Sequence, residues 1–165
     1  MNTKNLILAA VAAVSLVFVG CGHKHDHDDH DHGSHADHSD SHEKKVPGPN
    51  GGRLITSVEP AAEFLLLEDN RAQLTFVDEA LKPVAVAGQS ATAVAGDRMN
   101  PTPVTFESNG TALVSVNPLP DIPGQPFVLT LLASADAKPT VEKFNLKTYT
   151  CGGCDLQEYA CTCGH

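Results

Sequence analysis

Residues 104–116 read VTFESNGTALVSV, which is two runs of alternating apolar and polar residues on either side of a turn signal. The turn is Ser108-Asn109-Gly110-Thr111, and Asn-Gly between alternating runs is the strongest short-range sign of a β-hairpin. In the second run Ala112, Val114 and Val116 would share the buried face. We therefore expect a hairpin here, with antiparallel strands around it.

Similar period-two patterns recur on both sides of this hairpin. Apolar residues alternate in residues 72–76, and Phe127, Leu129 and Leu131 fall on one face of a further run. Other candidate strands are residues 63–67, 84–86, 91–95 and 141–146. Prolines cluster between the runs, as expected for turns. The fold class predicted for residues 46–148 is all-β, an antiparallel β-sandwich of about seven strands, with a partly open barrel as the alternative.

The predicted sandwich has little catalytic equipment. Residues 46–148 contain no His, Cys or Trp, which excludes a Ser–His or Cys–His nucleophile pair within them. Two carboxylate pairs remain, Glu59 with Glu63 and Glu68 with Asp69, and we expect these to be solvated turn residues. The 11 Lys and Arg against 20 Asp and Glu form no basic patch, so a nucleic-acid partner is not expected. The sequence favours a protein that is not an enzyme, and a carboxylate hydrolase is the weakest alternative.

The first 20 residues have the layout of an export signal. Lys4 is followed by an uncharged apolar run, residues 6–20, which is shorter than the about 20 residues of a membrane span. Phe18-Val19-Gly20-Cys21 resembles the lipobox of bacterial lipoproteins, with Phe18 where Leu is usual. The resemblance implies that Cys21 is lipidated and becomes the first mature residue. Gly22 in place of Asp then favours the outer membrane, so we expect a periplasm-facing or surface protein anchored in the cell envelope.

Residues 21–45 are rich in His and Asp. Residues 22–42 hold eight His, six Asp and one Lys, so the net charge is −5 with neutral histidines and +3 with all eight protonated. Such a segment cannot bury enough apolar surface to fold alone, and we expect a disordered tether. Neutral imidazole is a common ligand of zinc, copper and nickel, so protons should compete with metal near the ordinary histidine pKa of about 6.5. The candidate ligands are His23, His25, His27, His30, His32, His35, His38 and His42. The alternative is an incidental solvated spacer.

Two resemblances accompany this interpretation. The His-rich tether resembles the His-rich loops of bacterial zinc- and nickel-handling proteins. Residues 48–54, 62–64 and 74–78 together resemble a module of uncharacterised bacterial envelope proteins, some of which accompany metal-efflux adaptors. In that module His often stands at the positions of Asn50 and Ala62, and neither is His here. The resemblance therefore implies an envelope location and a metal transporter or efflux partner, and leaves a metal site inside the sandwich without its ligands.

The C-terminal segment, residues 149–165, predicts a small Cys/His knuckle. Cys151-Gly152-Gly153-Cys154 is followed by Cys161-Thr162-Cys163-Gly164-His165. The first pair has the spacing of a zinc knuckle, and Cys161 with Cys163, or Cys161 with His165, would supply the second pair of ligands. We expect residues 155–160 to form one helical turn that brings the halves together. Two disulfides are the alternative that export favours, and a redox pair is a third.

These features together predict a membrane-anchored envelope lipoprotein that binds or buffers divalent transition metals. Zn(II) is the first choice of ion, and Ni(II), Cu(I), Cu(II) and Co(II) are the others. The alternative is an envelope scaffold protein whose sandwich binds another protein, with C-terminal disulfides and an incidental His spacer.

Overall fold

The computed structural model describes residues 46–164, which form an all-β unit of eight antiparallel strands. The predicted export signal, the predicted His-rich tether with its eight histidines, Cys21 and His165 lie outside the described residues. A single 3-10 turn, η1, is the only helical element among residues 46–164, and none of them forms a helix long and apolar enough to cross a membrane. The elements are β1 (Arg53–Ile55), β2 (Ala61–Leu66), β3 (Ala72–Val77), β4 (Ser90–Ala95), β5 (Thr102–Ser108), β6 (Leu113–Ser115), β7 (Gln125–Leu132), β8 (Thr140–Leu146) and η1 (Glu158–Ala160).

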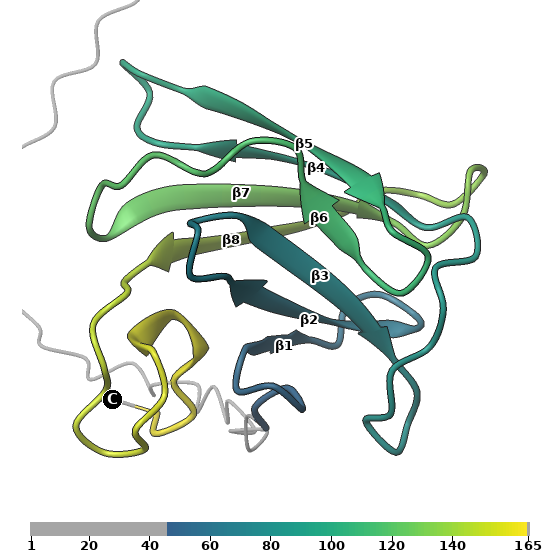
Figure 1. The fold of residues 1–165 in the computed structure, drawn as a ribbon, viewed down its shortest axis with the longest axis horizontal. Coiled ribbons are helices and arrows are strands. Elements are labelled where there is room, and N and C mark those ends of the chain that lie inside the picture. Colours follow the sequence, from purple (N-terminus) through teal and green to yellow (C-terminus); the bar gives the residue numbers. More distant parts are fainter. Residues whose placement is uncertain (1–45, 165) are drawn as a thin grey trace, which may run out of the picture. The chain divides into compact units, whose positions relative to one another are not determined.

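The strands form one ladder that folds over on itself into two layers (Figure 1). Their order is β1-β2-β3-β6-β5-β4-β7-β8, so β5 pairs with β6 of one layer and β4 of the other. Phe64 on β2 lies with its ring centroid 5.1 Å from that of Phe127 on β7 and 5.2 Å from that of Phe144 on β8. These contacts place β2 against β7 and β8. The predicted antiparallel sandwich is confirmed, with eight strands where about seven were expected.

Alternating apolar residues build the core, as the sequence predicted for most strands. Phe127, Leu129 and Leu131 are fully buried on β7, and Ala91, Ala93 and Ala95 point inward from β4. The hairpin at Asn109-Gly110 is present: β5 pairs with β6, and the Asn109 backbone nitrogen donates to the Ala112 carbonyl at 3.0 Å. This burial of apolar faces is the main stabilising term of the sandwich.

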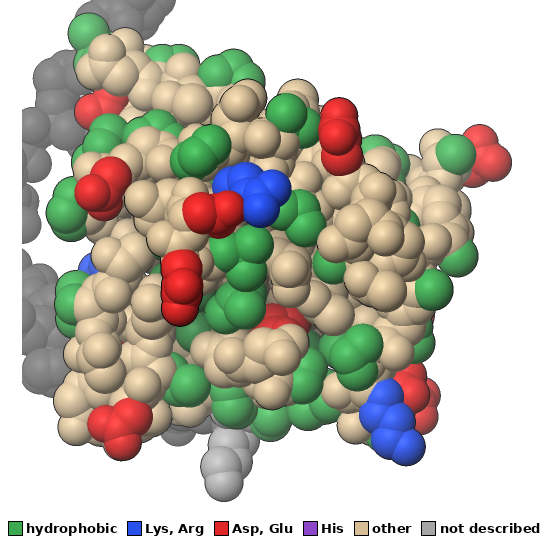
Figure 2. Space-filling model, viewed as in Figure 1, with side chains coloured by type: hydrophobic (Ala, Val, Ile, Leu, Met, Phe, Trp, Pro, Cys, Tyr) green, Lys and Arg blue, Asp and Glu red, His purple; other side chains and the backbone are tan. Residues whose placement is uncertain are grey.

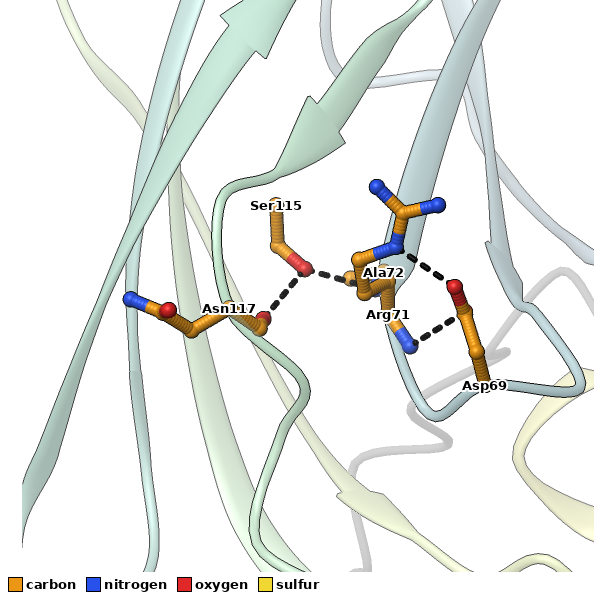
Figure 3. Close-up of polar contacts among 5 residues, drawn as sticks. All are labelled: Asp69, Arg71, Ala72, Ser115 and Asn117. Carbon is orange, nitrogen blue, oxygen red and sulfur yellow. Dashed lines mark hydrogen bonds and ion pairs between the residues drawn. The ribbon is translucent and has the colours of Figure 1, made fainter.

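The face assigned to β6 is wrong. Leu113 and Ser115 are buried on this strand, whereas Val116 is 45% exposed. The pairing of β6 with β3 stops at Val114, which lies opposite Gln73. The Ala72 backbone nitrogen, next along β3, donates instead to the Ser115 hydroxyl at 3.0 Å, and that hydroxyl donates to the Asn117 carbonyl at 2.8 Å (Figure 3). Ser115 thus satisfies backbone groups that a longer strand would have paired. The predicted strand at residues 84–86 is also absent, and β1 was not predicted.

A buried carboxylate fixes the loop that leads into β1. Glu63 on β2 is 1% exposed, and its carboxylate accepts hydrogen bonds from the backbone nitrogens of Asn50 and Gly52, both at 2.8 Å, and from the Asn50 side-chain amide at 2.7 Å. A Cβ at Gly48 would lie 2.4 Å from the Glu63 side chain, so only glycine fits there. Glu63 is therefore not the solvated turn residue that was expected, because the loop backbone replaces its water. Glu68 and Asp69 are exposed, as expected.

On the face drawn in Figure 2, acidic side chains are scattered and form no single patch. Figure 2 shows scattered Asp and Glu side chains and few Lys and Arg on the face viewed. An ion pair joins Arg71 Nε to Asp69 at 2.6 Å, between exposed side chains (Figure 3). Exposed pairs of this kind contribute little to stability.

Candidate metal centre

The C-terminal segment is fastened to the sandwich by Tyr159. Its ring is 4% exposed and meets the Phe64 ring edge-on, with centroids 5.5 Å apart. The Tyr159 hydroxyl accepts a hydrogen bond from the Leu66 backbone nitrogen at 3.0 Å. Burial raises the pKa of Tyr159 above its ordinary value, and the nearby Glu63 adds to this, while the Leu66 hydrogen bond acts in the opposite sense. The neutral phenol is therefore the form that the core favours.

Backbone hydrogen bonds shape the segment around this anchor. The Tyr159 nitrogen donates to the Lys147 carbonyl at 3.1 Å, and the Cys151 nitrogen donates to the Leu156 carbonyl at 2.7 Å. Between these two bonds Thr150 and Gln157 form an isolated bridge. Residues 151–156 are thus held as a tight loop, and η1 returns the chain past it. The expected helical turn is present, but it is a 3-10 turn confined to Glu158–Ala160.

η1 lies at the open side of the ladder, against both strands that end it. It contacts β8 and β1, and Figure 1 shows the C-terminal segment folded beside them. Arg53 on β1 reinforces this position: its guanidinium carbon lies 4.9 Å from the Phe144 ring centroid, and its Nη1 donates to the Tyr159 carbonyl at 3.4 Å. The segment therefore joins the two edge strands, which have no backbone pairing with each other.

The fold brings four cysteine sulfur atoms together at the end of this segment. The Sγ atoms of the four cysteines all lie within 4.8 Å of one another. Three of the separations are 3.4 Å from Cys161 to Cys151, 3.8 Å from Cys154 to Cys161 and 3.9 Å from Cys151 to Cys163. Within residues 46–164 this is the one group of three or more His, Cys, Asp or Glu that could hold a metal ion. Its members are Cys151, Cys154, Cys161 and Cys163.

These separations match the edges of a tetrahedral thiolate site. Zinc–sulfur bonds of about 2.3 Å in a tetrahedron place the sulfur atoms about 3.8 Å apart. A disulfide would need about 2.05 Å, and no disulfide links these four sulfur atoms. A set of four sulfur donors at this spacing fits Zn(II) and also suits other thiophilic ions.

Backbone amides surround the sulfur atoms, as they do in zinc knuckles. The Gly153 nitrogen donates to Cys151 Sγ at 3.4 Å, and the Cys163 nitrogen donates to Cys161 Sγ at 3.3 Å. The backbone N–H groups of Leu156 and Thr162 lower the pKa of Cys154 to about 6. At neutral pH this thiol is therefore largely deprotonated, which is the form that binds metal.

The thiols of Cys161 and Cys163 resist deprotonation because burial and neighbouring sulfur atoms disfavour their charged forms. The adjacent Cys154 and desolvation raise the pKa of Cys163 to about 12. The Cys163 N–H favours the Cys161 thiolate, but desolvation and the Cys151 and Cys154 sulfurs outweigh it, so the pKa of Cys161 is raised as well. Four adjacent thiolates would repel one another, and a divalent cation between them would offset that repulsion. The electrostatics therefore favour a bound cation.

Two glycines separate the first pair of ligands, and they are not equivalent. A Cβ at Gly153 would lie 2.9 Å from Cys163 Sγ, whereas a Cβ at Gly152 would have nothing within 4 Å. Gly153 thus leaves the room in which Cys163 approaches Cys151. Exposure also differs across the cluster, since Cys151 is 2% exposed and Cys163 is exposed.

The spacing of the four cysteines predicted that they come together, but the residues that hold their segment in place were not predicted. Tyr159, Arg53 and Glu63 carry no motif, and their contacts span many residues of sequence. His165, the alternative fourth ligand, and the eight tether histidines lie outside the described residues, as does Cys21, for which lipidation is predicted. The chain matches no protein-family model, no curated protein and no solved structure, so the case for this metal centre depends on its own geometry and chemistry.

Proposed function

We propose that this protein is a membrane-anchored lipoprotein of the bacterial cell envelope that binds divalent transition metals, with Zn(II) as the first choice. The observation that carries the proposal is the set of four sulfur atoms within 4.8 Å of one another at the end of the sandwich. Their separations are those of a tetrahedral thiolate site, and a segment this small gains stability from such a crosslink. In this proposal the cluster holds one ion tightly.

The remaining parts of the proposal come from the sequence. The His-rich tether would capture ions more loosely and in exchange with the surroundings, because eight imidazoles on a short acidic segment offer many alternative ligand sets. Cys21 would carry the lipid that anchors the chain. The sandwich would position the cluster for a transporter or efflux component in the envelope. Metabolic labelling with a radioactive fatty acid, compared between the wild type and Cys21→Ser, tests the anchor.

The metal site is tested on the full chain, purified in detergent with thiols kept reduced. Elemental analysis after dialysis against micromolar zinc should find an ion that a thiol-specific mercurial releases. Cys154→Ser should lose that ion, while Thr162→Ala, which changes a side chain beside the ligands and no sulfur atom, should keep it. Full retention of the mercurial-released ion in Cys154→Ser would contradict the proposal.

A thiol count keeps this test decisive even where Cys154→Ser fails to fold. Wild-type protein from a separate preparation, purified and denatured without reductant, should show four reactive thiols together with one released ion, and a diacylated Cys21 adds none. The alternative scaffold protein with two C-terminal disulfides would show none.

A further inference from the structure

The four cysteines of the cluster differ in their access to solvent. Cys163 is exposed, Cys154 and Cys161 are half-buried, and Cys151 is 2% exposed. Cysteines are oxidised where the sulfur is both negatively charged and open to the reagent. When an ion is bound, all four sulfur atoms are thiolates, because metal ligation requires the deprotonated form. Access is then what distinguishes them, and it favours reaction at Cys163.

The exposed cysteine lies next to the buried one. Cys163 Sγ is 3.9 Å from Cys151 Sγ, and the other two sulfur atoms, those of Cys154 and Cys161, are 3.8 Å apart. A disulfide needs a separation of about 2.05 Å, so each pair would have to close by about 1.8 Å. Both pairs join the Cys-x-x-Cys half of the cluster to the Cys-x-Cys half. Two disulfides between the halves therefore require only short movements of the sulfur atoms.

Gly153 provides the space in which Cys163 and Cys151 approach each other. A Cβ at this position would lie 2.9 Å from Cys163 Sγ and 3.9 Å from Cys151 Sγ. Because Cys151 is buried, an oxidant in solution reaches it poorly, and its sulfur reacts through a neighbour instead. The exposed Cys163 is that neighbour.

We propose that Cys163 is an oxidation site, at which a peroxide converts the metal centre into disulfides and releases its ion. This inference rests on the proposed function and adds how the ion leaves. The Cys163 thiolate attacks one peroxide oxygen: a sulfur–oxygen bond forms, the oxygen–oxygen bond breaks and hydroxide leaves, which gives a sulfenic acid. The Cys151 thiolate then attacks the Cys163 sulfur, so the sulfur–sulfur bond forms, the sulfur–oxygen bond breaks and a second hydroxide leaves.

The electrons balance in this sequence. The two sulfur atoms lose two electrons, one peroxide molecule gains them, and the ion keeps its charge. Only Cys154 and Cys161 then remain as thiolates, and two sulfur ligands hold a divalent ion less strongly than four. A second peroxide molecule oxidises this pair in the same way. A reductant that opens both disulfides restores the four ligands.

The test uses the full zinc-loaded chain in detergent, freed of reductant, with hydrogen peroxide as the probe and a chromophoric indicator for released zinc. About one to two equivalents of peroxide should release the ion, and phosphine reduction with added zinc should restore it. Dimedone, which traps sulfenic acids, should be found first on Cys163. Cleavage after Glu158 separates the two halves of the cluster in sequence, so the oxidised halves should stay joined until they are reduced.

Gly153→Ala and Gly152→Ala are matched variants that keep all four sulfur atoms, and both are loaded at saturating zinc. The methyl group of Gly153→Ala would lie against Cys163 Sγ, whereas that of Gly152→Ala would meet nothing within 4 Å. Gly153→Ala should raise the dimedone adduct on Cys163 by at least about threefold and lower the yield of the Cys151–Cys163 disulfide, because the second step is slowed. Gly152→Ala should match wild type.

The outcomes separate this inference from the proposed function. A first adduct on another cysteine, disulfides confined to each half, equal adducts in the two glycine variants, or zinc that a mercurial releases and peroxide does not would each overturn the oxidation site. All four leave the metal centre standing. A wild-type chain from which neither reagent releases zinc would overturn the metal centre and this inference with it.

Discussion

The hydroxyl of Tyr159 accepts a hydrogen bond from the backbone nitrogen of Leu66 at 3.0 Å, across 93 residues of sequence. This bond ties the segment that carries the four cysteines to the end of β2, in the same layer as the buried Glu63. The cysteine cluster is thus fixed to the core in part through this aromatic side chain, and changes at that side chain should affect both stability and the proposed metal binding.

Replacing Tyr159 by Phe keeps the ring against Phe64 but leaves the Leu66 N–H without its acceptor. A partly buried donor that loses its partner costs about 1–3 kcal/mol, so we expect the free energy of unfolding of Tyr159→Phe to fall by that amount. Urea unfolding followed by circular dichroism measures it. Tyr149→Phe is the matched control, because the Tyr149 side chain is 59% exposed, and it should change stability by less than about 0.5 kcal/mol. Equal losses in the two variants would contradict the role given to Tyr159.

The same phenol should make the protein sensitive to alkali. Its pKa is raised in the folded state above the ordinary 10.0, so the folded protein retains the proton longer than the unfolded chain does. The resulting stability is fully present below pH 10 and is lost as pH rises from there through the folded-state pKa. Unfolding measured at pH 9 and pH 11 should show a larger decrease for wild type than for Tyr159→Phe. Parallel decreases would exclude Tyr159 as the titrating group.

Gly153 and Gly152 provide a paired test of the cluster's geometry. A methyl group at position 153 would meet Cys163 Sγ at 2.9 Å and push it away from Cys151, whereas at position 152 it would meet nothing. We expect Gly153→Ala to weaken zinc binding by about tenfold or more, which corresponds to about 1.4 kcal/mol, and Gly152→Ala to leave it within twofold. Competition with a chromophoric zinc chelator measures both. Equal affinities in the two variants would show that zinc binding does not require the Cys163 sulfur to lie next to Gly153.

Removing the ion should loosen the C-terminal segment and lower stability. An ion that binds only the folded state stabilises it by about 2.7 kcal/mol when its free concentration is one hundred times its Kd. Unfolding of the full chain with zinc and after chelation should differ by about this amount, and acidification should reduce the difference because protons compete for the sulfur atoms. Identical unfolding curves with and without zinc would contradict a stabilising ion.

Glu63 should be essential to the loop before β1. Its carboxylate accepts three hydrogen bonds while 1% exposed, and the amide of Glu63→Gln would turn a donor toward backbone N–H groups. Hydrogen bonds to a charged group are worth about 1.5–3 kcal/mol, so we expect a loss of at least about 2 kcal/mol in urea unfolding. The exposed Glu68→Gln is the control and should be near neutral. A neutral Glu63→Gln would mean that the loop does not depend on the charge.

Much of the sandwich could be predicted because alternation is a local signal. Phe127, Leu129 and Leu131 alternate with polar or less buried positions, and the pattern alone gives the strand and its buried face. The pattern does not give the buried face of β6, where Leu113, Val114 and Val116 are all apolar. The polar residue Ser115 is buried there because its hydroxyl bonds to the backbone of Ala72 and Asn117. β1 spans only Arg53–Ile55, which is too short to show a period.

The cysteine spacing predicted the cluster, since the Cys-x-x-Cys pair and the second pair are local features. The supports of the cluster were beyond the sequence. Tyr159 and Arg53 act through contacts made only after the two ends of the ladder come together, and no pattern within either segment indicates the other.

The position of η1 between β1 and β8 has a consequence for the tendency of the protein to aggregate. Unpaired strand edges are templates for association with other chains, and these two strands end the ladder. A cysteine-bound ion would keep the covering segment in place over both edges. Chelation would uncover them, so prolonged metal starvation would make the β-sandwich a candidate for edge-to-edge aggregation.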